Sequence, residues 1–110
     1  MIIHKEMIED IVRGLIDIFG EKLDSIILYG SVARGDDVSE SDIDIALIVN
    51  SGIEDDVKSV FLHWNAELDI KYNKIFSIID IEKNTIDKWG KVVPFYKNIQ
   101  SEGVVLWKAA

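Results

Sequence analysis

The sequence predicts an α/β (α+β) protein in which helices pack largely on one face of a small mixed sheet. Three observations lead to this fold class. Residues 8–19 carry apolar side chains at helical spacing, residues 25–29 form an almost unbroken apolar run, and apolar residues fill every odd position of 43–49. These patterns predict, in order, a helix, a strand covered on both faces and an amphipathic strand.

Glycines punctuate the first predicted elements. Gly20 is expected to end the helix over 8–19, and Gly30 is expected to end the strand over 25–29, because glycine permits sharp turns. The apolar stripe of this helix consists of Ile8, Ile11, Val12, Leu15 and Phe19.

A second long helix is predicted over residues 53–72. The acids at 54–56 complement the dipole of its first turn, which explains them better than a metal cluster does. Its apolar stripe is interpreted as core and consists of Val57, Val60, Phe61, Trp64 and Leu68.

The rest of the chain predicts a further strand and several short elements. The strand covers residues 74–81, and a short helix includes Ile86. Pro94 opens another helix, which Gly103 can end. Residues 104–107 form either a final edge strand or an apolar tail.

Length and composition predict one cytoplasmic domain, residues 1–110, with a single core. No apolar run approaches the roughly 18 residues that span a membrane, and the first residues do not resemble a signal peptide. The absence of cysteine excludes a disulfide framework and a thiolate metal site. The formal net charge of −8 disfavours a nucleic-acid template, because binding to phosphates depends on lysine and arginine.

Two aspartates on the second predicted strand are candidate metal ligands. Asp42 and Asp44 share the strand face opposite to the odd-numbered apolar residues. Residues two apart on a strand lie roughly 6.5–7 Å apart, so two such carboxylates can converge on metal ions used for displacement at phosphorus. Mg²⁺ suits a site that combines a few carboxylates with substrate phosphates. The alternative is that both aspartates simply form the solvated end of an amphipathic strand.

The turn that starts at Gly30 is a candidate phosphate site. Ser31 offers a hydroxyl and free backbone N–H groups where a helical turn begins. Arg34 returns to the same side of that turn and could reach a phosphate oxygen. An ordinary strand-to-helix turn, with Arg34 paired to Asp36 or Asp37, is the alternative.

Residues 30–35 (Gly-Ser-Val-Ala-Arg-Gly) and 41–45 (Ser-Asp-Ile-Asp-Ile) together resemble the signature of the DNA polymerase β-like nucleotidyltransferase superfamily. More narrowly, they resemble the minimal nucleotidyltransferase (MNT) proteins, and the order and length of the other elements also fit. The resemblance implies the nucleotidyltransferase fold, with the turn and the carboxylates meeting at one end of the sheet.

The resemblance also implies roles for the candidate site residues. Asp42 and Asp44 would be the catalytic, Mg²⁺-binding carboxylates. Gly30 and Ser31 would bind the triphosphate tail of the donor ATP, and Arg34 would contact a phosphate.

The chain departs from the superfamily pattern at the third carboxylate, which active members usually carry on a neighbouring strand. Ser77 is expected at that position. Asp80 has the opposite parity from Ser77, so a regular strand would direct it to the other face.

The MNT resemblance implies transfer of AMP from ATP to a hydroxyl of an acceptor, expected to be a tyrosine of a HEPN-domain toxin that this chain neutralises as an antitoxin. Two alternatives stay open. One is a small-molecule nucleotidyltransferase of the aminoglycoside-modifying type, completed by a homo-oligomer or another subunit. The other is a non-catalytic nucleotide-binding subunit that neutralises its partner by contact alone.

Overall fold

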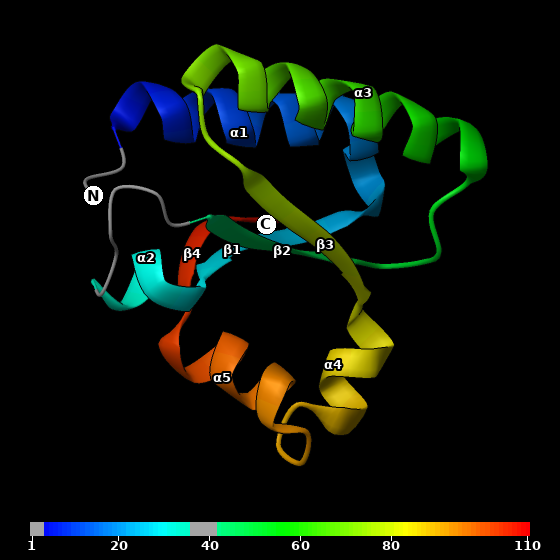
Figure 1. Ribbon diagram of the computed structural model, residues 1–110. Coiled ribbons are helices and arrows are strands. Elements are labelled where there is room, and N and C mark those ends of the chain that lie inside the picture. The colour runs from blue at the N-terminus through cyan, green and yellow to red at the C-terminus, as the bar shows by residue number, and fades with distance from the viewer. Residues whose placement is uncertain (1–3, 36–41) are drawn as a thin grey trace.

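The computed structural model describes residues 4–35 and 42–110, and its elements follow the predicted order along the chain (Figure 1). The helices are α1 (Lys5–Phe19), the 3-10 turn η1 (Gly20–Lys22), α2 (Gly30–Arg34), α3 (Asp55–Tyr72), α4 (Lys83–Trp89) and α5 (Pro94–Glu102). The strands are β1 (Leu23–Tyr29), β2 (Ile43–Val49), β3 (Phe76–Glu82) and β4 (Val104–Lys108).

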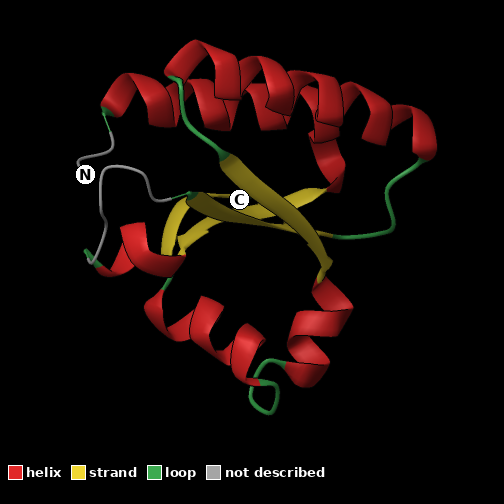
Figure 2. Ribbon diagram, viewed as in Figure 1, coloured by secondary structure: helices red, strands yellow, loops and turns green. Residues whose placement is uncertain are grey.

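The four strands form one mixed sheet in the order β3-β2-β1-β4 (Figure 2). Strand β1 pairs antiparallel with both β2 and β4, whereas β2 and β3 are parallel. The mixed sheet of the prediction is therefore confirmed. Residues 104–107 belong to an edge strand, β4, and the alternative of an apolar tail is wrong.

Helices cover both faces of the sheet. The two long helices, α1 and α3, lie together on one face, and the shorter helices α4 and α5 lie on the other (Figure 1). Odd positions of β2 join the core beneath α1 and α3, while its even positions Ala46 and Ile48 pack with Ile86 of α4 and Ile99 of α5. The fold class is confirmed. The predicted packing of helices on one face holds for α1 and α3 but was wrong for α4 and α5, which cover the second apolar face of the sheet.

The stripe predicted for the second long helix is only partly buried. Phe61 and Leu68 are buried in the core below α3, and Trp64 packs against it. Val60 is 57% exposed, so its assignment to the core was wrong. The regular spacing of apolar residues could not distinguish the covered side of α3 from its margin.

Candidate active site

Three side chains form a row across one end of the sheet, on the face that carries α4 and α5. Asp44 of β2 lies opposite Tyr29 of β1 and opposite Ser77 of β3. Because paired residues on neighbouring strands project to the same face, Tyr29, Asp44 and Ser77 point to the same side. The row lies where β1 ends and where β2 and β3 begin, at the margin of the apolar packing below α4 and α5.

Asp42 joins this row through Ser77. The Ser77 hydroxyl donates a hydrogen bond to Oδ2 of Asp42 over 3.4 Å. Asp42 is exposed and Asp44 is half-buried. Asp42 directly precedes β2, so the two carboxylates lie at the same end of the sheet.

The glycine turn lies directly against Asp44. Gly30 begins α2 with φ +77°, a backbone conformation that favours glycine. A Cβ atom on Gly30 would overlap Oδ2 of Asp44 and lie 3.2 Å from its Cγ. The absence of a side chain at Gly30 thus lets the turn approach the carboxylate, and Ser31 follows at the first turn of α2.

Arg34 connects this turn to helix α5. It lies in the last turn of α2, and its Nη1 is 3.6 Å from Oε2 of Glu102 on α5. The positive charge of Arg34 also stabilises the ionised form of Asp44. Asp36 and Asp37, which the sequence offered as partners of Arg34, lie outside the described residues, as does Ser41 of the motif.

The electrostatics of the row favour a cation. Burial raises the pKa of Asp44, the negative charge of Asp42 raises this pKa further, and Arg34 opposes both effects. Burial and the charge of Asp44 also raise the pKa of the Tyr29 hydroxyl. A cation between the carboxylates would remove their repulsion, so the residues present fit a divalent metal.

Ser77, which was expected from the sequence at the third acidic position, lies beside Asp44 in the sheet. Asp80 pairs with Leu47, whose side chain is in the core below α1 and α3, and is itself exposed. Asp80 therefore lies on the opposite face, in agreement with its parity.

The described part of the chain offers two carboxylates for a metal here. Within residues 4–35 and 42–110, no three or more acidic, histidine or cysteine side chains gather in a group that could hold an ion. Mg²⁺ at this row would take its remaining ligands from phosphates and water, which is common for this ion. Asp42 and Asp44 are the side chains that would hold it.

Tyr29 is a member of the row that the sequence did not single out. It was counted as the last residue of the apolar run, although its odd position in β1 and its place before Gly30 put it beside Asp44. Its ring meets that of Phe95 on α5 edge-to-face, with centroids 5.8 Å apart. The Phe95 contact has no signal in the sequence, because the two residues are far apart along the chain.

Replacing Asp44 by asparagine is expected to stabilise the metal-free protein at neutral pH by up to about 1 kcal/mol, the range of partly exposed charge interactions. The pKa of Asp44 is higher in the folded protein than in the unfolded chain, so its charged form destabilises the fold. This penalty is complete above the folded pKa and disappears as the pH falls below the unfolded value.

Urea unfolding of wild type and Asp44→Asn over a pH series measures this difference. The advantage of the variant should shrink as the solution is acidified. An advantage that is independent of pH, or a loss of stability at neutral pH, would contradict the assigned charge environment.

The described residues contain no helix that is both long and apolar enough to cross a membrane. A family model described as "Polymerase beta, Nucleotidyltransferase" matches residues 14–109. Because the match covers most of the chain, this protein belongs to the polymerase β nucleotidyltransferase family, and it is an enzyme of nucleotidyltransferase type.

Two proteins of Methanocaldococcus jannaschii are similar in sequence, and both are named as candidate protein adenylyltransferases. MJ0604 is 33% identical over 107 residues, which cover 94% of this chain and 98% of that protein. MJ0141 is 35% identical over 81 residues, which cover 74% of this chain and 81% of that protein.

Solved structures share the fold at low sequence identity. A chain from a toxin–antitoxin complex with AMP-PNP superimposes with a TM-score of 0.64 at 20% identity, covering 93% of this chain and 73% of that one. A chain from a complex of a tri-AMPylated Shewanella oneidensis HEPN toxin with an MNT antitoxin gives 0.60 at 18%, covering 96% and 72%. These similarities agree with the predicted nucleotidyltransferase fold.

Proposed function

We propose that this protein transfers AMP from ATP to a hydroxyl of a protein partner, and that the acceptor is a tyrosine of a HEPN-domain toxin. The observation that supports the proposal most is the position of Asp44, which lies against Gly30 at the turn and on the same strand end as Asp42. Paired carboxylates beside a glycine turn are suited to binding a metal ion together with phosphates.

The relatives support the proposed partner. The Methanocaldococcus jannaschii proteins are named for adenylyl transfer to protein, and one neighbouring complex contains an AMPylated HEPN toxin with its MNT antitoxin. The net charge of −8 favours a basic partner surface. We assign the acceptor hydroxyl to that second chain.

In the proposed reaction, the backbone and hydroxyl at Gly30 and Ser31 orient the triphosphate, and Arg34 adds a positive charge beside it. Asp42 and Asp44 would hold Mg²⁺, which when bound supplies neutralisation of the charge that develops on the phosphates. The acceptor oxygen forms a bond to the α-phosphorus of ATP as the bond to the β-phosphate oxygen breaks. Pyrophosphate leaves, and the hydroxyl proton passes to solvent.

Intact mass spectrometry tests this function. The protein is incubated with ATP, Mg²⁺ and a purified HEPN-domain protein from the same genome, and the mass of each chain is measured. Addition of AMP to the HEPN protein, followed by peptide mapping to a tyrosine, is the expected result. Addition of AMP to a small hydroxylated compound, with none on protein, would favour the small-molecule alternative.

A second function, neutralisation of the partner by contact alone, is favoured by one observation: a serine, Ser77, and not an acidic residue lies beside Asp44 on the neighbouring strand. Under this alternative the protein binds its partner and the nucleotide without transfer. The HEPN protein would then lose its activity in the complex while its mass stays unchanged.

Replacing Ser77 by aspartate should increase the rate of AMP transfer by about 10-fold or more, because general-base catalysis typically contributes at least this much. The new carboxylate would lie beside Asp44 and near Asp42, where it can accept the proton of the acceptor hydroxyl. The rate is measured by the time course of the partner's mass.

Ser77→Asn is the matched control, since it has nearly the same size as aspartate but cannot accept the proton. It should leave the rate at or below that of wild type. An equal gain in both variants would show that shape, and not the carboxylate, changed the rate.

A further inference from the structure

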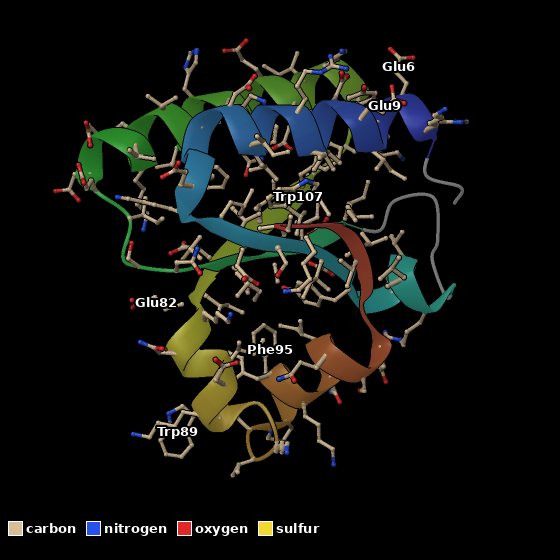
Figure 3. The ribbon with its side chains drawn as sticks, turned by 180° about the vertical axis from the view of Figure 1, so that it is seen from behind. Glu6, Glu9, Glu82, Trp89, Phe95 and Trp107 are labelled. Atoms are coloured by element: carbon tan, nitrogen blue, oxygen red, sulfur yellow. The ribbon has the colours of Figure 1, made fainter. Side chains whose placement is uncertain are left out.

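An exposed aromatic side chain lies next to the candidate active site. Phe95, near the start of α5, is 45% exposed although it is a large apolar residue. It lies on the α4 and α5 side of the sheet (Figure 3). This is the face onto which Asp44 and Ser77 also project.

The ring of Phe95 is held by two neighbours. Tyr29 meets it edge-to-face, with planes at 86° and centroids 5.8 Å apart, and Tyr96 contacts it at 5.6 Å. Both tyrosines are half-buried against the core cluster below α4 and α5. Such aromatic pairs fix the orientation of a ring, so part of Phe95 stays in solvent in a defined position.

Tyr29 also ties this ring to the carboxylates. It is the cross-strand neighbour of Asp44 and the residue directly before Gly30. Neighbouring residues therefore connect the glycine turn, through Asp44 and Tyr29, to Phe95. Along these residues the surface changes from charged to aromatic.

We propose that Phe95 is the stacking platform for the nucleobase of the donor nucleotide, with Tyr29 as the residue that positions it. This inference rests on the proposed function and names a further part of the same site. A nucleoside triphosphate has an anionic triphosphate and an aromatic base. The carboxylates would hold a metal ion for the triphosphate, and the ring of Phe95 presents a π-face to the base. Stacking on an aromatic ring tolerates any base, so Phe95 contributes affinity for the base. The contacts to the triphosphate fix the position of the nucleotide in the site.

Equilibrium binding of ATP and of inorganic tripolyphosphate, each with Mg²⁺, tests the platform. Phe95→Ala should weaken ATP binding by about 10-fold, in the range measured when an aromatic stacking partner of a base is removed. Tripolyphosphate has no base, so its affinity should stay at the wild-type value. Phe95→Trp should restore ATP binding, whereas Phe95→Leu, which keeps apolar bulk, should not.

Trp89 provides the matched control. It is 44% exposed, on α4, and projects away from the sheet (Figure 3). Trp89→Ala should therefore bind ATP as wild type does. Thermal unfolding of each variant verifies that it is folded.

The outcomes separate the platform from the proposed function. If wild type binds ATP and Phe95→Ala binds it equally well, or loses ATP and tripolyphosphate to the same extent, the platform is wrong while the function stands. A loss of HEPN binding with unchanged ATP binding would assign Phe95 to the partner interface and would also overturn the platform. If wild type binds neither ligand, the proposed function fails together with it.

Discussion

The Asp42→Asn, Asp44→Asn double variant should transfer AMP at least about 10³-fold more slowly than wild type, because removal of even one preorganised electrostatic group typically costs 10²–10³. Both carboxylates lie at the start of β2, and Asp44 faces the glycine turn. Asparagine keeps the size of each side chain but removes the charges that would hold Mg²⁺. The mass time course of the HEPN partner measures the rate.

Asp80→Asn is the control for a general loss of negative charge. Asp80 is on the neighbouring strand β3, but it is exposed on the opposite face of the sheet. Its replacement should leave the transfer rate unchanged. A double variant that retained wild-type transfer, or an equal loss in Asp80→Asn, would remove Asp42 and Asp44 from the proposed chemistry.

Gly30→Ala should reduce AMP transfer by about 10²-fold, the effect expected when a reacting group is displaced by about 1 Å. The new methyl group would overlap Oδ2 of Asp44 and force this carboxylate to move. The variant should also lose about 1–2 kcal/mol of stability, because an L-residue at φ +77° is strained. Transfer rates and urea unfolding separate these two effects.

Gly20→Ala isolates the strain. Gly20 also has positive φ, at +56°, but a Cβ atom there would have no heavy atom within 4 Å. It lies at the end of α1 that leads into β1, whereas the site lies where β1 ends. Gly20→Ala should lose stability and keep its transfer rate; a matching loss of transfer would mean that destabilisation alone explains Gly30→Ala.

Local patterns predicted much of the site geometry. Strand alternation predicted opposite faces for Ser77 and Asp80, and Asp80 lies on the opposite face, because side-chain parity depends only on neighbouring residues. Asp42 directly precedes β2, where its charge acts on Asp44. Gly30 was predicted to end the strand over 25–29 with a sharp turn, and it directly follows β1.

Contacts between distant segments could not be predicted in the same way. Arg34 forms an ion pair with Glu102, and this contact depends on the packing of α5 beside α2. The contact between Tyr29 and Phe95 depends on the packing of α5 against β1. The spacing of apolar residues identifies an apolar stripe on a helix but not the element that covers it. It therefore could not assign α4 and α5 to the second face of the sheet, and it could not show that Val60 lies outside the core.

The most direct measurement of the site is NMR with Mn²⁺ as a paramagnetic substitute for Mg²⁺, added in the presence of AMP-PNP. Backbone signals of Gly30, Ser31, Asp42, Asp44 and Ser77 should broaden first, because these residues surround the proposed metal position. Broadening that begins instead in the pocket between α1 and α3 that Asp10 and Glu67 line, or that spreads evenly over the acidic surface, would contradict a nucleotide site at the start of β2.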